Sequence, residues 1–443
     1  MIFSVDLMDV ASMPNNLPQS PFSRLEIPDE EKYLYCIRCG LCLSACPLYR
    51  ESLKETDSPR ARVTLVRKAV EGELGLSHNF TDQMYRCLDC LACNAICPVG
   101  IRPADLALEA RYLIHQARPQ PWIKNLIFRD YFPHPERMAL SMLPMLAYQR
   151  LGPKRLVNRL GLTRLLPARL RDMERMLPTV PVRPLRQSLL EVTPANSERQ
   201  YRVGFFLGCF QSLVFAEGSA ATARVLATNR CQVVTPKDVK CCGMPHMGYG
   251  DVEEARALAR HNINSFGRLD VDVIVTDCAT CGSTLKRYGS HILAQDPEYA
   301  GRASAFSARV RDISEFLGSI PLREPEHPVK IRVTYHDPCH LRWGQNVRQQ
   351  PRQLLQLAGA ELVEMKESDW CCGSAGTQAF THYETSMRVL TRKMTNAAAT
   401  EAPVIATGCP GCQLQLGLGV QRTGLRASVL HPVQVLDRAY QGE

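Results

Sequence analysis

The stretch CIRCGLCLSACP at residues 36–47 arranges four cysteines as C-x2-C-x2-C-x3-C-P, and CLDCLACNAICP at residues 87–98 repeats the pattern. Two residues between successive cysteines let three thiolates converge on three corners of one iron–sulfur cube, while the fourth cysteine points away from it. Zinc ribbons use C-x2-C pairs instead of four-cysteine runs that end in proline, so zinc is the less favoured interpretation. The two runs predict two [4Fe–4S] clusters and a function in electron transfer.

In two-cluster ferredoxins with this pattern, the fourth cysteine of each run binds the cluster of the other run. We therefore expect two mixed ligand sets. They are Cys36, Cys39, Cys42 and Cys97 for the first cluster, and Cys87, Cys90, Cys93 and Cys46 for the second. The long step from Cys46 to Cys87 favours helices between the runs, because a compact β-type ferredoxin has a much shorter step.

The composition is that of an ordinary globular protein, apart from the cysteines. The chain has 443 residues, of which 45% are hydrophobic and 22% charged, so we expect about two to four domains. Its start has no signal-peptide pattern, and no apolar run is long enough to span a membrane. Nineteen cysteines then fit thiolate clusters in a reducing cytoplasm. We expect a cytoplasmic protein whose contact with the inner face of the membrane, if it makes one, is peripheral.

Residues 122–190 carry most of the net charge of +9. The basic side chains there are Lys124, Arg129, Arg137, Arg150, Lys154, Arg155, Arg159, Arg164, Arg169, Arg171, Arg175, Arg183 and Arg186, against Asp130, Glu136, Asp172 and Glu174. Interleaved apolar residues and prolines predict short basic amphipathic helices, which suit an anionic membrane surface or an acidic partner. The alternative is a solvated linker that wraps the neighbouring domain. Nucleic-acid binding is not expected, because no aromatic-studded basic groove accompanies the charge.

Ten of the other eleven cysteines form two sets of one pattern. The first set is Cys209, Cys241, Cys242, Cys278 and Cys281, and the second is Cys339, Cys371, Cys372, Cys409 and Cys412. Corresponding members lie 130 or 131 residues apart, the double cysteine precedes a glycine in both sets, and each set ends in a C-x2-C pair. This constant offset predicts an internal duplication. The remaining Cys231 is predicted to be a buried thiol of the core.

Short apolar runs and helical stretches alternate around these cysteines. The predicted strands are 202–207, 231–234, 271–276, 331–335, 361–365 and 404–407, and the predicted helices are 215–228, 252–268, 349–358 and 382–398. This alternation predicts a small parallel α/β unit in each copy. Because ligands gather at the carboxyl ends of parallel strands, the five thiols of each set should meet at one edge of each sheet.

Five thiols in one place favour iron–sulfur or zinc chemistry. Tetrahedral zinc would use four of them and leave the fifth idle. The double cysteine could instead bridge irons in a cluster that is not a simple cube, or act as a redox dithiol beside a cluster. We expect each set to ligate a cluster or a metal. We call the two places the first and the second CCG site, after their Cys-Cys-Gly motif.

Six stretches carry a resemblance to a known family. They are SPRARVTLVRK at 58–68, CCGMPHMGYGDVEEARALARHNI at 241–263, RVRDISEFL at 309–317, YHDPCHLRWGQNVRQQPRQLL at 335–355, CCGSAGTQAFTH at 371–382 and HPVQVLDRAY at 431–440. From about residue 33 to its end, the chain resembles the iron–sulfur subunits of bacterial glycolate oxidase. The wider group includes the iron–sulfur subunits of anaerobic glycerol-3-phosphate dehydrogenase and of heterodisulfide reductase.

The resemblance implies a partner flavoprotein with FAD that oxidises a 2-hydroxy acid, such as glycolate to glyoxylate. Single electrons would then pass through the clusters of this chain to a membrane acceptor, quinone. One feature departs from the glycolate oxidase pattern, in which each terminal pair often keeps only one cysteine. Here both pairs are complete, at Cys278/Cys281 and Cys409/Cys412. That is closer to heterodisulfide reductase, whose CCG sets carry non-cubane clusters.

The chain has no Rossmann fingerprint that opens a βαβ unit and no P-loop, so flavin and substrate should lie on another polypeptide, and no catalytic residue is expected here.

A second hypothesis is disulfide or quinone chemistry at a CCG site, or a role in a D-lactate or glycerol-3-phosphate dehydrogenase. Its candidate proton donors are His246, His336, His340 and His382. A third hypothesis is a scaffold protein whose CCG sites bind zinc. Arg60 and Arg62 are interpreted as surface arginines rather than as groups that tune a cluster.

We predict an α+β multidomain protein. An N-terminal tail (1–26) precedes an α-helical ferredoxin module with two [4Fe–4S] clusters (27–118), a basic amphipathic connecting segment (119–198), and two tandem α/β CCG domains (199–325 and 326–443). Proline-rich composition at 176–195 predicts the hinge between the halves.

Overall fold

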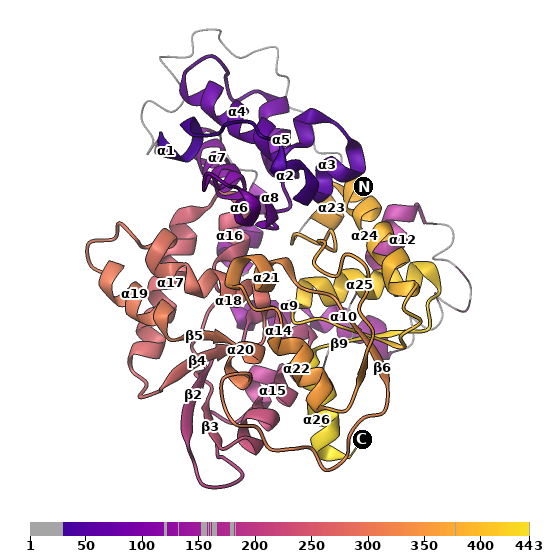
Figure 1. The fold of residues 1–443 in the computed structure, drawn as a ribbon. Coiled ribbons are helices and arrows are strands. Elements are labelled where there is room, and N and C mark those ends of the chain that lie inside the picture. The colour runs from indigo at the N-terminus through magenta and orange to yellow at the C-terminus, as the bar shows by residue number, and fades with distance from the viewer. Residues whose placement is uncertain are drawn as a thin grey trace.

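The computed structural model describes residues 30–118 and 122–442, apart from 132, 152–156, 158, 160, 162–165, 178–180, 182 and 377. The predicted N-terminal tail therefore lies outside the described residues, as do Lys154, Arg155 and Arg164, the side chain of Lys124, and part of the predicted hinge. In Figure 1 the ferredoxin module lies at the top and the two CCG domains lie side by side beneath it.

The ferredoxin module is built from short helices. These are α1 (Glu31–Leu34), α2 (Leu41–Ala45), α3 (Pro47–Ser52), η2 (Glu55–Asp57), α4 (Pro59–Val70), α5 (His78–Arg86), α6 (Ala92–Ile96) and α7 (Pro103–Ala117). Ser58 caps α4 by accepting a hydrogen bond from the Ala61 amide at 3.0 Å, and Pro59 supplies the fixed φ that suits a first helical position. Between the two cysteine runs, all regular structure that the chain forms is helical, as the long step predicted.

The sheets of the two CCG domains have the same strand order, apart from the additional β1 of the first. The first sheet runs β1-β3-β2-β4-β5 and the second β7-β6-β8-β9, and all pairs are parallel except β1 with β3. The strands are β1 (Val192–Thr193), β2 (Tyr201–Phe205), β3 (Cys231–Val234), β4 (Val273–Thr276), β5 (Val310–Asp312), β6 (Arg332–Tyr335), β7 (Glu361–Leu362), β8 (Val404–Ala406) and β9 (Ser428–Leu430). All six predicted strands form, which confirms the duplicated parallel α/β architecture, whereas β1, β5 and β9 were not foreseen.

Helices flank both sheets, and one apolar cluster of the core is shared by the two domains. In the first domain they are α14 (Cys209–Val214), α15 (Ala216–Thr228), α16 (Met244–Tyr249), α17 (Val252–Gly267), α18 (Ala279–Lys286), η5 (Tyr288–Ile292), α19 (Ala300–Ala308) and α20 (Ile313–Leu317). In the second they are α21 (Cys339–Gln345), α22 (Gln350–Leu357), α23 (Gln378–Thr381), α24 (Tyr383–Ala398), α25 (Pro410–Thr423) and α26 (Pro432–Gln441). Val203 and Phe205 of β2 belong to the same buried cluster as Val333 of β6 and Leu436 of α26. Each domain therefore completes its core with residues of the other.

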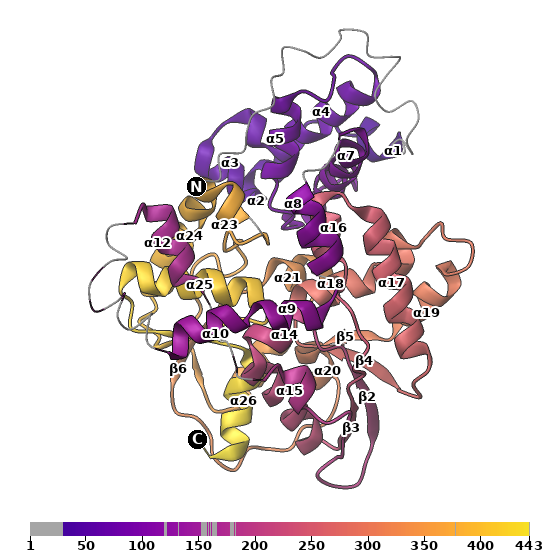
Figure 2. The same ribbon diagram turned by 180° about the vertical axis from the view of Figure 1, so that it is seen from behind.

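The connecting segment crosses the back of the molecule, as Figure 2 shows. Its elements are α8 (Trp122–Asn125), η3 (Leu126–Tyr131), α9 (Pro135–Ser141), α10 (Leu143–Arg150), α12 (Ala168–Arg175) and α13 (Leu185–Ser188). Phe128 and Met138 are buried, and Asp172, only 3% exposed, accepts a hydrogen bond from the Tyr383 hydroxyl at 2.6 Å. The described part of the segment thus wraps both CCG domains. None of the described helices has the length and apolar composition needed to cross a bilayer.

Candidate metal centres

The cysteines of the predicted first ferredoxin set line a single cavity. Cys36, Cys39 and Cys42, from the loop before α2 and from α2 itself, meet Cys97 there, at the end of α6. Gly40 makes the turn between Cys39 and Cys42, with a left-handed φ of 82° that favours glycine. Burial and the neighbouring thiols, partly opposed by a backbone hydrogen bond at Arg60, raise the pKa of Cys42 to about 11. A metal would have to displace this proton.

The second ferredoxin set surrounds a buried arginine. Cys46, Cys87 and Cys93 are all buried, and their thiolate charges act on Arg62, which is 1% exposed. Burial opposes the charge of the guanidinium, but these thiolates outweigh it and raise the pKa of Arg62. Our interpretation of Arg62 as a surface residue was therefore wrong, because α4 packs its side chain between the thiols. Arg60 does reach the surface and pairs with Glu55 at 2.7 Å.

The ten CCG cysteines form one continuous series of neighbouring thiols, in which the Cys372 thiol donates a hydrogen bond to the Cys412 sulfur at 3.4 Å. The series runs Cys209, Cys241, Cys242, Cys281, Cys278, Cys409, Cys412, Cys372, Cys371 and Cys339. Each set of five is thus brought together. The contact of Cys278 with Cys409, where the two sets meet, was not foreseen. It arises because β4 and β8 end facing each other, as shown by the Ala279 amide, which donates to the Gly408 carbonyl at 2.9 Å.

In both double cysteines, it is the second cysteine whose pKa is lowered. The neighbouring thiols of Cys241 and Cys281 lower the pKa of Cys242, and those of Cys371 and Cys412 lower the pKa of Cys372. In both copies the second cysteine of the pair therefore most readily becomes the thiolate that a metal binds.

Of the four candidate histidines, His336 lies within ligand distance of a CCG site. Its ring nitrogen and the sulfurs of Cys372 and Cys412 all lie within 4.8 Å of one another. Burial and the charge of Lys393 lower the pKa of His336 to about 3, and within the described residues neither ring nitrogen has a hydrogen-bond partner. His246 instead lies 2.6 Å from the Phe128 carbonyl, and His382 lies 3.2 Å from the Asp82 carboxylate.

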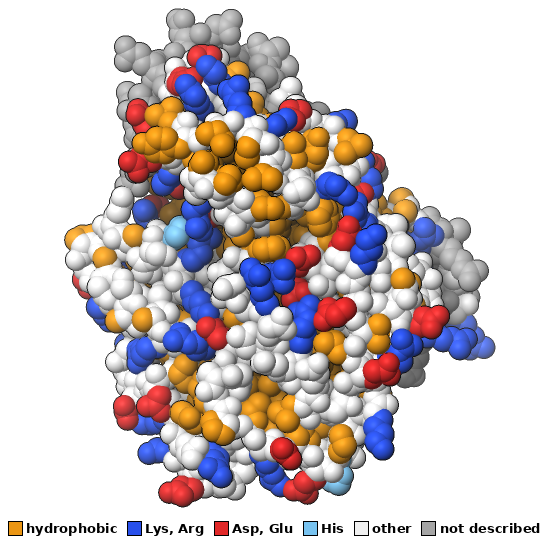
Figure 3. All heavy atoms as spheres, in the orientation of Figure 1, with side chains coloured by type: hydrophobic (Ala, Val, Ile, Leu, Met, Phe, Trp, Pro, Cys, Tyr) orange, Lys and Arg blue, Asp and Glu red, His pale blue; other side chains and the backbone are white. Residues whose placement is uncertain are grey.

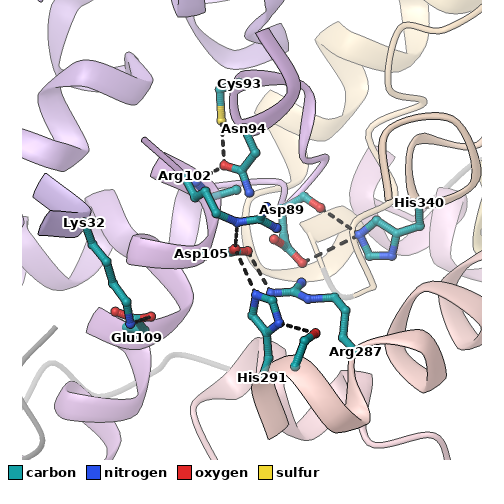
Figure 4. A network of polar contacts seen from close by, with 12 residues as sticks. Lys32, Asp89, Cys93, Asn94, Arg102, Asp105, Glu109, Arg287, His291 and His340 are labelled. Atoms are coloured by element: carbon teal, nitrogen blue, oxygen red, sulfur yellow. Dashed lines mark hydrogen bonds and ion pairs between the residues drawn. The ribbon is translucent and has the colours of Figure 1, made fainter. Parts of the chain in front are cut away.

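Polar contacts that the sequence did not reveal dock the ferredoxin module on both CCG domains (Figure 4). Asp105 of α7 pairs with Arg287 at 2.9 Å and faces His291 of the first domain. Burial alone would disfavour a charged carboxyl, but the facing His291 and the charge of Arg287 hold the pKa of Asp105 well below its usual value. His340 of the second domain reaches Asp89, which lies between two cysteines of the second ferredoxin set.

This docking continues the series of thiols into the ferredoxin module. The thiol of Cys90 interacts with Cys371 and Cys339 on one side and with Cys93 and Cys46 on the other. Sulfur atoms therefore follow one another from the surface at Cys39, through both ferredoxin sets, into the interior of the CCG domains.

Comparison with known proteins gives matches to three family models. Residues 32–101 match the 4Fe-4S dicluster domain, residues 119–177 match the linker region of glycolate oxidase iron–sulfur subunits, and residues 203–286 and 333–417 each match the cysteine-rich CCG domain.

Three similar proteins align with this chain, two over most of its length and one over about half of it. A probable glycolate oxidase iron–sulfur subunit of Bacillus subtilis is 37% identical over 409 residues, which are 90% of this chain and 92% of that protein. The glycolate oxidase iron–sulfur subunit of Escherichia coli is 28% identical over 413 residues, or 92% and 94% of the two chains. Lactate utilization protein A of Geobacillus kaustophilus is 29% identical over 238 residues, which are 53% of this chain and 98% of that one.

Proposed function

Because the chain belongs to the family of glycolate oxidase iron–sulfur subunits, we propose that it conducts electrons from an FAD-containing partner subunit to a membrane quinone. The partner would oxidise a 2-hydroxy acid, with glycolate as the first candidate. Two relatives of this chain are named as iron–sulfur subunits, so the chain would be one component of a larger oxidoreductase and would need no flavin or 2-hydroxy-acid site of its own.

The observation that carries this proposal is the unbroken series of thiols from Cys39 to Cys209. When bound, iron–sulfur clusters accept and release single electrons. Cys36, Cys39, Cys42 and Cys97 would hold one [4Fe–4S] cluster, and Cys87, Cys90, Cys93 and Cys46 the other. The two sets of five would each hold a further iron–sulfur cluster or zinc. Arg62 would stabilise the thiolates of the second ferredoxin set and raise the potential of its cluster.

Electrons would enter at the first ferredoxin set. Cys39 is its most exposed cysteine, and exposed apolar side chains line the cavity, with Ile37 at 65% and Val99 at 40%. Apolar surface around a cluster ligand suits the docking of a partner protein whose cofactor must come within electron-transfer distance.

A second candidate function is disulfide or quinone chemistry at the second CCG site. The position of His336 beside Cys372 and Cys412 favours it, since a neutral imidazole could ligate a metal or hold a substrate there. A substrate that binds this site would change the spectrum of the bound cluster. A chain that only conducts electrons would not show this change.

Peripheral contact with the membrane is supported by the outer side of the connecting segment. Leu140 of α9 and Leu143 and Leu151 around α10 are more than half exposed, and Arg137 and Arg150 are exposed on the same helices. Apolar and basic side chains together suit an anionic lipid surface. Replacing Leu140 and Leu143 by Ser should release the complex from anionic vesicles.

The test of the main proposal is Cys93→Ser in the complete complex, with Cys231→Ala as the matched control because Cys231 lies in the core, away from the series. We expect Cys93→Ser to abolish reduction of a quinone analogue while direct dye reduction by the flavoprotein continues. Cys231→Ala should preserve both. Normal quinone reduction by Cys93→Ser would contradict the proposal, and iron, sulfide and zinc contents would identify the metals at the CCG sites.

A further inference from the structure

A cleft of about 320 Å³ opens where the ferredoxin module meets the second CCG domain. Its walls come from α2, α3 and α6 on one side, and from α21 and the loop before Cys371 on the other. Figure 3 shows this face, where apolar side chains of the ferredoxin module border a group of basic and acidic side chains below it. The volume is that of a site for a small organic molecule.

The cleft reaches two of the candidate metal centres at once. Cys90 of the second ferredoxin set and Cys371 of the second CCG set both line it. A molecule bound there would lie against one sulfur ligand from each centre. It could therefore receive electrons from the cluster that Cys90 would help to hold, without entering the interior of the protein.

Two of the three tryptophans of the chain form the aromatic walls of the cleft. Arg342 lies over the Trp343 ring at 4.8 Å, and Arg392 lies over the Trp370 ring at 5.0 Å. Arg348 also lies over the Trp343 ring, at 5.6 Å, and these cation–π contacts hold both rings in the wall of the cleft. Ala45, Ala92 and Ile96 complete an apolar lining, which selects a flat aromatic ligand.

Among the described charged side chains that line the cleft, one cation is available to contact a ligand. Asp369 pairs with Arg342 at 3.1 Å, and Glu367 pairs with Arg392 at 2.6 Å, so both acids are already neutralised. Arg50 is exposed, and among the described residues it has no recorded ion-pair partner. Its guanidinium can donate hydrogen bonds to a carbonyl oxygen and stabilise negative charge that develops on it.

We propose that this cleft binds the quinone ring that receives the electrons, which rests on the function proposed above. The ring stacks against Trp343 and Trp370, and Arg50 hydrogen-bonds one of its carbonyl oxygens. The [4Fe–4S] cluster that Cys90 would help to hold would supply two electrons, one at a time, and water that enters the open cleft would supply two protons, so that the quinone becomes the hydroquinone.

Binding is tested with the soluble naphthoquinone menadione and the full chain with its clusters in place. Trp122, 74% exposed on the connecting segment, provides the control. In Trp122→Leu both remaining tryptophans line the cleft, and menadione should quench their fluorescence saturably. In Trp343→Leu/Trp370→Leu, which retains only Trp122, saturable quenching should vanish. Equilibrium dialysis should show a Kd about tenfold higher for Trp370→Leu, whereas Trp370→Phe, which keeps a flat ring, should largely retain binding.

Reoxidation of the clusters tests the role of the cleft in the reaction. The protein is reduced with dithionite, and its visible absorbance is followed after menadione or ferricyanide is added. Arg50→Gln should slow reoxidation by menadione about tenfold, with a smaller change in the Kd of the neutral oxidised quinone, because the anion forms only after electron transfer. Reoxidation by ferricyanide should be unchanged.

The outcomes separate this inference from the proposed function. Clusters that the flavoprotein cannot reduce would contradict the electron-conducting function itself. Normal reduction by the flavoprotein, with equal menadione binding and reoxidation in wild type, Trp343→Leu/Trp370→Leu and Arg50→Gln, would overturn the cleft as the quinone site and leave that function standing.

Discussion

The imidazole of His340 donates a hydrogen bond to the carbonyl oxygen of Asp89 at 2.8 Å and faces its carboxylate at 3.6 Å. Burial opposes a charge on this ring, but the hydrogen bond with Asp89 and the neighbouring negative charges raise the pKa of His340 to about 10. Asp89 lies between Cys87 and Cys90, and His340 follows Cys339. This ion pair therefore ties the backbone of one candidate metal centre to that of the next.

Replacing His340 by Leu should detach the ferredoxin module from the second CCG domain. The Asp89 carboxylate would remain buried without its countercharge, which costs about 3–5 kcal/mol when one partner of a buried pair is removed. We expect a fall of that size in the free energy of unfolding and faster proteolytic cleavage between the two parts. The double variant Asp89→Asn/His340→Gln, which removes both charges, should recover most of the loss. A single variant as stable as the wild type would contradict this account.

Gly250 should be intolerant of a side chain, because the ferredoxin module packs directly against it. Its φ is 85°, and a Cβ placed there would lie 2.3 Å from the carbonyl oxygen of Arg111 in α7. We expect Gly250→Ala to lower the free energy of unfolding by about 2–4 kcal/mol, from left-handed strain and overpacking together. Gly248→Ala is the matched control, since nothing lies within 4 Å of its added Cβ. Equal thermal stability of the two variants would contradict the observed docking of α7 on α16.

The elements that the sequence predicted well are those governed by local pattern. Cysteine spacing predicted the duplicated sets of five, and short apolar runs predicted strands such as β3, whose bounds Cys231–Val234 agree with the prediction. The run predicted at 361–365 forms a strand only over Glu361–Leu362, although the neighbouring β6 continues to Tyr335. Cys231 is fully buried, as predicted.

The features that the sequence did not predict depend on how distant segments meet. Nothing in the stretch around Arg62 distinguishes it from Arg60, yet Arg62 is buried beside the thiols of the second ferredoxin set, whereas Arg60 lines the more open cavity of the first. The contact of Cys278 with Cys409 and the burial of Asp172 against Tyr383 likewise follow from the relative placement of the two domains and the connecting segment. Buried charges of this kind are recognised only when their partners are known.

Ile37 should contribute to the docking of the flavoprotein. Its side chain is 65% exposed beside the cavity of the first ferredoxin set, and a carboxylate there would have to be desolvated on association. We expect Ile37→Glu to slow cluster reduction by the flavoprotein about tenfold, with unchanged iron content and unchanged reduction by dithionite. Leu190→Glu is the control and should have no effect, because Leu190 is 62% exposed at the end of the connecting segment, just before β1. Equal rates for both variants would place the docking surface elsewhere.

Asp312 should make the first CCG domain less stable as the pH rises. The carboxyl is 1% exposed at the start of α20, where Oδ1 accepts from the Ser314 amide at 2.8 Å and, among the described residues, Oδ2 has no partner. Burial, with a smaller contribution from Glu315, raises the pKa of Asp312 to about 7. The native state therefore binds a proton that the unfolded chain releases at about pH 4. The stability from this proton is complete below about pH 4 and is lost as the pH rises through about 7.

Asp312→Asn should remove this dependence, because an amide keeps the capping oxygen and carries no charge. Urea unfolding should show the wild type losing at most about 1.4 kcal/mol per pH unit from this group between about pH 4 and 7, and the variant losing correspondingly less. The control is Asp270→Asn, whose side chain is 99% exposed and which should leave the slope unchanged. If the slopes of wild type and Asp312→Asn coincide, Asp312 does not hold a proton in the native protein, and the Ser314 amide and Lys286 suffice to keep its buried carboxylate charged.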